Sequence, residues 1–217
     1  MNLAEKAYIE LEEMIITLKL NPGQLISENE ISQMLGIGRM PVREAIKRLE
    51  MAHLVRVLPH RGIMVTEIKT EEIFLQMELR RVLEALIVKR ATKFSLPIER
   101  TKFLKLADAY ETATIENDDI KAVRIDDEFN KFLAKCSRNP FAANALTPLH
   151  ALARRMYFFQ YKLNMELTKE INEGHVKLMR AVASGDESIA LQALEDLLFS
   201  TEKLYEINID TWYSMGN

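Results

Sequence analysis

Residues 36–50 read G-I-G-R-M-P-V-R-E-A-I-K-R-L-E and predict a helix with one apolar and one basic side. Apolar side chains recur at the i, i+3, i+4, i+7 spacing of a helix face, as Val42, Ala45, Ile46 and Leu49. Off that face lie Arg39, Arg43, Lys47 and Arg48. Proline is favoured at the first helical position because it has no N–H to leave unbonded, so we expect the helix to begin near Pro41, after a turn at Gly36 and Gly38.

Positive charge is concentrated around this helix. Residues 37–62 hold six basic side chains and two acidic ones. The whole chain has 29 Lys and Arg against 32 Asp and Glu, which gives a net charge of −3. Non-specific attraction of the whole molecule to polyanions is therefore not expected. A local basic surface is what contact with phosphate groups requires.

The composition is that of an ordinary globular protein. The chain has 217 residues, of which 48% are hydrophobic and 28% charged, and this length is enough for two modest domains. Its single cysteine, Cys136, excludes an intrachain disulfide and a cysteine-rich zinc site, and fits a reducing compartment. The sequence shows no signal-peptide pattern and no apolar run of about 18 residues. We therefore expect a cytoplasmic protein with no membrane contact.

Two further helices are predicted before the basic helix. An amphipathic pattern covers residues 4–19, and the N-P-G run at residues 21–23 ends it. Ser27 and Glu30 then match a capping box, in which the serine hydroxyl and the glutamate carboxylate each accept a backbone N–H near the helix start. This pattern predicts a short second helix that ends at Leu35.

A β-hairpin is predicted after the basic helix. Residues 54–58 and 63–68 are aliphatic and β-branched, which is typical of strands. Between them, Gly62 can take the positive φ that a tight turn needs, and Arg61 is expected at the tip.

The rest of the chain is predicted to be helical. Helix-breaking residues at Pro97, Pro140 and Gly185 separate apolar-periodic segments. We count six such segments, at residues 70–95, 98–115, 118–137, 140–163, 168–184 and 186–212. The predicted fold is thus mainly α, with a winged helix-turn-helix at residues 1–69 and an all-α bundle at residues 70–217.

Two runs of this sequence resemble the GntR family of bacterial transcription regulators. They are R-M-P-V-R-E-A-I-K-R-L-E-M-A-H-L-V, which matches the family's recognition helix, and P-H-R-G-I-M-V, which matches its wing. The six-helix continuation is similar to the effector domain (FCD) of the FadR-like branch, in its short VanR-like form. This resemblance implies a ligand-responsive regulator, commonly a repressor, that binds a pseudo-palindromic DNA operator as a homodimer. Residues 1–69 would bind DNA, and residues 70–217 would bind the effector and dimerise.

The resemblance also implies which residues contact DNA. Those that match groove-contacting or wing positions, or lie beside them, are Arg39, Met40, Arg43, Arg61, Gly62 and Asn29. Arginine can bond the guanine edge with two N–H groups or hold a phosphate. Met40 and Asn29 depart from the family's usual residues, which changes the expected operator sequence and not the mode of docking. The alternative is that the arginines form a solvated surface paired with Glu44 and Glu50.

A second set of residues is expected to line an effector cavity. The run M-E-L-R-R-V-L-E resembles the first helix of the family's effector domain, which places Arg80 toward the cavity as a partner for a small carboxylate. The alternative is a salt bridge from Arg80 to Glu84. By the same resemblance, Asp126, Asn130 and His175 would line the cavity; alternatively, His175 is a buried histidine bonded to a neighbour.

Many relatives in this family hold a metal ion with an aspartate and three histidines. In this chain Asn130 and Leu197 replace two of the expected histidines, which leaves Asp126 and His175. Tight zinc or nickel sites use three or four strong donors. We therefore expect no tightly bound metal cofactor, and at most weak binding of a divalent ion at Asp126 and His175.

Two other functions compete with this interpretation. An enzyme on the helical domain is disfavoured, because no nucleophile–base pair, glycine-rich phosphate loop or complete metal triad is present. A DNA-binding dimer that has lost its effector response stays open, because two expected ligand histidines are missing. The aromatic residues Tyr157, Phe158, Phe159 and Tyr161 are expected in the core or a dimer interface rather than in a ligand site.

Overall fold

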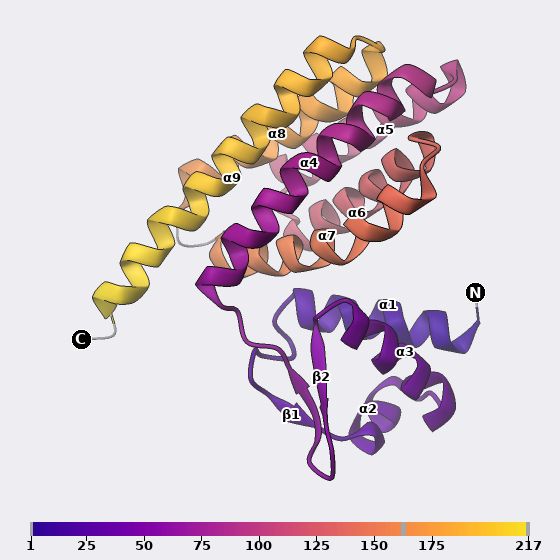
Figure 1. Cartoon of the computed structure of the whole chain (residues 1–217), viewed down its shortest axis with the longest axis vertical. Helices are drawn as coiled ribbons and strands as arrows, with labels where there is room; N and C mark the ends of the chain where they lie inside the picture. The colour runs from indigo at the N-terminus through magenta and orange to yellow at the C-terminus, as the bar shows by residue number, and fades with distance from the viewer. Residues whose placement is uncertain (1, 162–163, 216–217) are drawn as a thin grey trace. The chain divides into compact units, whose positions relative to one another are not determined.

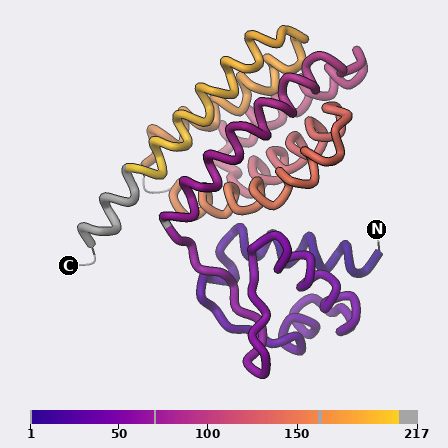
Figure 2. Tube along the Cα trace, in the orientation of Figure 1, coloured from indigo at the N-terminus to yellow at the C-terminus, as the bar shows by residue number. Residues whose placement is uncertain are grey.

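The computed structural model describes residues 2–161 and 164–215, and for residue 70 and residues 207–215 it describes the backbone alone (Figure 1). The chain forms two compact units. The N-terminal unit contains the residues up to Lys69 together with Pro148–Phe159, and the helical unit contains Thr70–Thr147 and the residues from Gln160 onward. Figure 2 traces the chain through both.

The N-terminal unit combines three helices with a small sheet. Its elements are α1 (Leu3–Ile16), β1 (Leu25–Ile26), α2 (Glu28–Leu35), α3 (Arg39–Met51), β2 (Val55–Leu58) and β3 (Gly62–Val65). The strands are antiparallel and lie in the order β1-β3-β2. Helix α1 packs on α3, and the core between the elements contains fully buried Leu11, Ile15, Ile31, Leu49 and Leu54.

The local signals of the sequence explain most boundaries in this unit. Ser27 caps α2 with the predicted capping box, since its hydroxyl accepts from the N–H of Glu30 and the carboxylate of Glu30 accepts from the N–H of Ser27. Helix α3, predicted to begin near Pro41, begins two residues earlier at Arg39 and is preceded by extended Gly38. Pro41 still lies in the first turn, where a missing N–H costs nothing.

The hairpin has the predicted turn and a third strand that the sequence did not reveal. Gly62 has a φ of +105°, and a Cβ built there would lie 2.9 Å from the carbonyl oxygen of Ile26. Glycine is therefore required both by the turn and by the close approach of β1. Strand β1 pairs with β3 through only two residues, Leu25 and Ile26, which is too short a run to recognise from alternation.

The second half of α7 groups with the N-terminal unit. Arg155 donates from Nη1 to the carbonyl oxygen of Thr66 at 3.0 Å and to its hydroxyl at 2.9 Å. Arg154 lies with Nη2 3.8 Å from Oε2 of Glu12, and both side chains are buried. The contacts tie this helical segment to α1 and to the residue that follows β3. Phe158 and Phe159 in the same segment are partly buried.

The helical unit is built from long antiparallel helices. They are α4 (Thr70–Phe94), α5 (Pro97–Ile115), α6 (Asp119–Cys136), α7 (Pro140–Gln160), α8 (Met165–Ser184) and α9 (Glu187–Met215). Helix α8 packs between α5 and α9, and α9 also packs along α4, as Figure 1 shows. The six predicted segments match these helices within a few residues; the predicted end at Leu163 lies outside the described residues.

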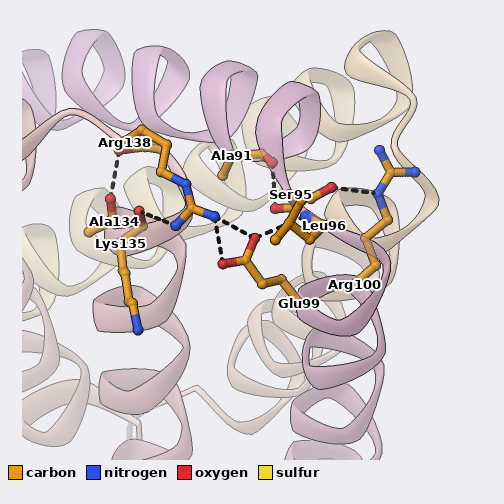
Figure 3. Close-up of polar contacts among 9 residues, drawn as sticks. Ala91, Ser95, Leu96, Glu99, Arg100, Ala134, Lys135 and Arg138 are labelled. Carbon is orange, nitrogen blue, oxygen red and sulfur yellow. Dashed lines mark hydrogen bonds and ion pairs between the residues drawn. The ribbon is translucent and has the colours of Figure 1, made fainter.

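One end of this bundle is closed by a polar network (Figure 3). Arg138, after α6, donates from Nη2 to both carboxylate oxygens of Glu99 at 2.7 and 2.8 Å. Glu99 also accepts from the N–H of Leu96, which caps α5. Arg100 donates to the carbonyl oxygens of Ser95 and, at the end of α8, Ser184. These bonds satisfy helix-end groups that would otherwise lack partners.

Candidate nucleic-acid interface and buried polar cluster

The residues at the start of α3 are exposed. Arg39, Met40 and Arg43 are its first, second and fifth residues, and Met40 is 66% exposed. Asn29, the second residue of α2, is exposed as well. The opposite side of α3 carries the four predicted apolar residues, all buried. The helix therefore presents arginine and methionine to solvent while its other side fixes it to α1.

Arg43 is held by an acidic partner that the sequence analysis did not predict. Its Nε donates to Oε1 of Glu28 at 3.1 Å, and its Nη2 donates to Oε2 at 2.8 Å. The hydrogen bond from Arg43 lowers the pKa of Glu28, and the same bond raises the pKa of Arg43. The predicted alternative partners were Glu44 and Glu50, of which Glu50 accepts from the N–H of Val57. The pair is exposed, so it orients Arg43 without burying it.

Arg48, on the same helix, has a different role. It donates from Nη1 to Glu5 at 2.7 Å, and its guanidinium lies 4.0 Å from the centre of the Tyr8 ring. Both partners belong to α1, so Arg48 fastens α3 to α1. Two arginines of α3 thus bond different neighbours, Arg43 to α2 and Arg48 to α1.

The wing carries an exposed arginine. Arg61 lies in the turn between β2 and β3, and its N–H donates to the carbonyl oxygen of Leu58 at 3.0 Å. Arg56 on β2 is also exposed. The N-terminal unit therefore carries exposed guanidinium groups on both a helix and a hairpin tip, and these can contact the phosphates and base edges of a duplex.

In the helical unit, Arg80 forms the first half of a polar cluster. Its Nε donates to Oε1 of Glu84 at 2.7 Å, and its Nη1 lies 3.4 Å from the sulfur of Met77. Burial alone would lower the pKa of Arg80, but the carboxylate of Glu84 and the neighbouring Tyr205 and Asp126 raise it overall. Burial raises the pKa of Tyr205. The salt bridge to Glu84, which the sequence analysis left open as the alternative for Arg80, is present.

The second half of the cluster centres on Asp126. Its Oδ1 accepts from Nδ2 of Asn130 at 3.0 Å and lies 3.3 Å from Nδ1 of His175. The His175 ring lies 5.3 Å from the ring of Tyr110, whose hydroxyl donates to Asn172 at 3.0 Å. Three of the four predicted lining residues thus contact one another, and the charge of Asp126 also acts on the fourth, Arg80. Tyr110, Asn172 and Tyr205 were not predicted, because no local sequence pattern indicates that they belong to this cluster.

The donor atoms of this cluster do not fit a tightly bound metal ion. Asn130 supplies an amide that is bonded to Asp126, and Leu197 is buried and apolar. A Cβ at Gly174 would lie 3.0 Å from Cδ1 of Leu197, so these two residues pack closely where the family would place another ligand. Among the side chains that the structure describes, no group of three His, Cys, Asp or Glu residues is arranged to hold a metal.

Models of known protein families match both parts of the chain. The model of bacterial regulatory proteins of the gntR family matches residues 3–65, and the FCD domain model matches residues 76–199. This chain belongs to the GntR family. The matches confirm the predicted fold class, a winged helix-turn-helix followed by a helical FCD domain.

Relatives of this GntR protein are transcription regulators. It is 31% identical over 134 residues to an HTH-type regulator from the TAR-I ttuE-ttuC' intergenic region of Agrobacterium vitis, covering 60% of this chain and 78% of that one. It is 23% identical to the HTH-type transcriptional repressor RspR of Escherichia coli, covering 97% and 93%. The GntR protein is therefore a DNA-binding transcription regulator, and the expectation that it is not an enzyme is confirmed by these relatives.

Solved structures show the same fold. E. coli McbR/YncC superposes with a TM-score of 0.79 at 20% identity, over 100% of both chains. A GntR regulator from Rhodococcus sp. RHA1 superposes with a TM-score of 0.73 at 22% identity, over 93% of this chain and 96% of that one. In the part of this GntR protein that the structure describes, no helix is long and apolar enough to cross a membrane.

Proposed function

We propose that this GntR regulator is a repressor that binds a pseudo-palindromic operator as a homodimer and responds to a small carboxylate effector. The DNA-binding part of this proposal is supported by the exposed guanidinium groups on α3 and at the hairpin tip. Repression is supported by RspR, a relative named as a repressor that aligns with almost the whole chain.

In the proposed complex, α3 enters the major groove. Arg39 and Arg43 would contact base edges or phosphates there, with Met40 and Asn29 beside them. Arg61 and Gly62 of the hairpin would approach the minor groove or the backbone. A homodimer has two such surfaces related by a two-fold axis, so the operator should carry two similar half-sites.

The proposed effector site is the polar cluster around Arg80 and Asp126. An arginine side chain has five N–H donors, and Glu84 takes the one on Nε. Nη1 contacts the Met77 sulfur, a weak acceptor, so an effector carboxylate there would replace a weak contact with a charge-assisted one. Asn130 and His175 would then bond polar groups elsewhere on the effector.

The effector would act through differential affinity. If it binds better to the form of the dimer in which the two α3 helices do not match the half-sites, it weakens DNA binding by a fixed factor. The same factor must describe how DNA weakens effector binding. This scheme is checked by measuring, with one effector, how far the effector weakens DNA binding and how far DNA weakens the binding of that effector.

Two experiments test the proposal. Selection of bound DNA from a random pool should recover two inverted half-sites at a fixed spacing; recovery of no motif would contradict operator binding. A thermal-shift screen of sugar acids, dicarboxylates and aromatic acids should find a compound that raises the melting temperature, because a ligand that binds only the folded state stabilises it. A reporter under the recovered operator would separate repression from activation.

One observation favours the effector-free alternative. Arg80 is already paired with Glu84, and Asp126 already accepts a hydrogen bond from Asn130, so both charged side chains have partners without an effector. If the screen finds no stabilising acid while the selection recovers an operator, the protein is a DNA-binding regulator that works without this effector site.

A further inference from the structure

Helix α7 contributes to both units of the structure. It runs without a break from Pro140 to Gln160, and Pro148 lies inside it. Pro148–Phe159 group with the N-terminal unit, although by sequence they fall in the FCD match at residues 76–199. The division falls at a residue that cannot donate a backbone hydrogen bond within the helix. A segment of the FCD domain is therefore a structural part of the unit that carries α3 and the hairpin.

Two consecutive arginines of this segment are buried. Arg154 is 7% exposed and Arg155 is 4% exposed, and the neighbouring Leu152 and Met156 are buried with them. Arginine is almost never fully buried unless its N–H groups are bonded. Both side chains are therefore expected to hold particular acceptors.

Arg155 reaches the base of the hairpin. Its Nη1 donates to the carbonyl oxygen of Thr66 at 3.0 Å and to the hydroxyl of Thr66 at 2.9 Å. That hydroxyl lies 2.7 Å from the carbonyl oxygen of His53 and 3.1 Å from that of Leu54, so it can donate its hydrogen to either. Thr66 follows β3, and His53 and Leu54 connect α3 to β2. Arg155 therefore bonds at the point where α3 and both strands of the hairpin meet.

The connection from α3 to β2 depends on this hydrogen bonding. His53 has a φ of +57°, a left-handed conformation that is unfavourable for a residue with a Cβ. Such a conformation persists only where neighbouring groups hold it. The Thr66 hydroxyl holds the carbonyl oxygen of His53, and Arg155 in turn holds the hydroxyl. Loss of the Arg155 side chain would thus loosen the hairpin without removing any of the exposed basic groups.

Arg154 fixes the same segment to α1. Its Nη2 lies 3.8 Å from Oε2 of Glu12, and Oε1 of Glu12 accepts from the hydroxyl of Tyr8 at 2.6 Å. Burial raises the pKa of Tyr8, so the hydroxyl keeps the proton that it donates. The guanidinium of Arg48, from α3, lies 4.0 Å from the centre of the Tyr8 ring. The segment is therefore connected to α1, and through α1 to α3, one residue before the arginine that bonds Thr66.

We propose that Arg155 is a positioning residue for operator binding, which holds the hairpin in a fixed orientation relative to α3. It is buried, so it cannot contact a duplex itself. If α3 occupies the major groove while Arg61 contacts DNA from the hairpin tip, both must fit at once, and preorganised contacts bind more tightly than loose ones. The inference rests on the proposed DNA contacts of α3 and the hairpin. It adds to them a residue outside the gntR-family match at residues 3–65.

Hydrogen exchange tests the positioning without DNA. In the full chain, Arg155→Ala and Thr66→Val should each speed amide exchange in residues 54–66 about 10-fold, because local opening becomes easier when a charge-assisted hydrogen bond is lost. Thr66→Val removes only the hydroxyl, so it carries the test if the alanine variant fails to fold. Arg180→Ala is the matched control, since it removes an exposed arginine that is paired with two carboxylates of α5, and it should leave this exchange unchanged. Unchanged exchange in the test variants overturns the proposal.

A double-mutant cycle separates positioning from general stability. We expect Arg155→Ala to weaken operator binding about 5- to 10-fold, and Arg155→Lys, which keeps a charged donor, to lose less. In an Arg61→Ala background, Arg155→Ala should weaken binding by no more than about 2-fold, because residues that act through one contact are not additive. Fluorescence anisotropy measures these affinities, at protein concentrations corrected for the folded fraction. Equal losses in both backgrounds overturn the proposal.

The outcomes distinguish this inference from the proposed function. A wild type that binds no operator, or an Arg61→Ala variant that binds it unchanged, refutes the proposed DNA contacts, and the hydrogen-exchange result stays readable. Full operator affinity in Arg155→Ala refutes the positioning role and leaves the proposed function standing.

Discussion

Arg43 of α3 and Glu28 at the start of α2 form a two-bond ion pair, with N–O distances of 3.1 and 2.8 Å. The pair joins two helices that would both lie close to a bound duplex. Because phosphate groups also attract arginine, Glu28 would compete with DNA for one of the two arginines that match the family's groove contacts. The pair therefore bears on how tightly this regulator binds its operator.

Replacing Glu28 with Gln should strengthen DNA binding. The variant removes a carboxylate that opposes phosphate and frees Arg43, so we expect affinity to rise about 3- to 10-fold, in keeping with the ~1 kcal/mol of an exposed ion pair. Fluorescence anisotropy across a salt series measures this. Glu10→Gln, which loses one charge from the exposed pair with Lys6, is the control and should change little. Weaker binding by the Glu28 variant would mean that the glutamate positions Arg43 for DNA.

Arg43→Ala and Arg48→Ala should separate DNA contact from domain stability. We expect Arg43→Ala to lose on the order of 1–3 kcal/mol on the operator if the side chain contacts a base, and to weaken all sequences uniformly if it contacts phosphate. Arg48→Ala should keep operator affinity but lower the free energy of unfolding by about 1 kcal/mol, because it removes the contacts with Glu5 and Tyr8. Equal effects of both variants on DNA binding would contradict this division.

Glu84→Leu should destabilise the helical unit. It leaves the guanidinium of Arg80 buried without its nearest carboxylate, and breaking a buried pair in this way costs about 3–5 kcal/mol. Urea denaturation measures the loss. The double variant Arg80→Met with Glu84→Leu should recover most of it, because no unpaired charge remains. A small loss in the single variant would show that Tyr205 and Asp126 compensate Arg80 by themselves.

Gly185→Ala should destabilise the protein more than Gly36→Ala. Both glycines have positive φ, +81° and +63°, so alanine is strained by about 1 kcal/mol at either site. At Gly185 the new Cβ would also overlap the guanidinium of Arg100, which must then leave its bond to Ser184. At Gly36 nothing lies within 4 Å. Thermal unfolding of both variants compares them, and equal shifts would show that Arg100 moves at no cost.

The elements of the fold could be predicted because their signals are local. The capping box at Ser27, the positive φ of Gly62 and the end of α8 at Gly185 each depend on neighbouring residues, and all three are present. The start of α3 was misplaced by two residues, because Gly38 and Pro41 are both compatible with a helix start and only the packed helix selects between them.

The candidate sites could be predicted only in part. The resemblance to the GntR family predicted that Asp126, Asn130 and His175 line one cavity, and the structure brings Asn130 and His175 into contact with Asp126. Tyr205 beside Arg80 could not be found, because more than a hundred residues separate the two and no pattern links them. The exposed side of α4, with Leu75, Leu79 and Val82, could not be predicted either, since α4 is apolar on several sides and only its packing decides which side stays outside.

The sequence by itself therefore determined the order of helices and strands and the basic character of the third helix, because periodicity, caps and turns act over a few residues. Its motifs indicated the family by resemblance. The tertiary structure alone decided that Arg43 pairs with Glu28 and Arg48 with Glu5, and that Pro148–Phe159 group with the N-terminal unit. These contacts join residues from 15 to more than 80 positions apart. Their partners are selected by the packing of whole helices, which no local pattern encodes.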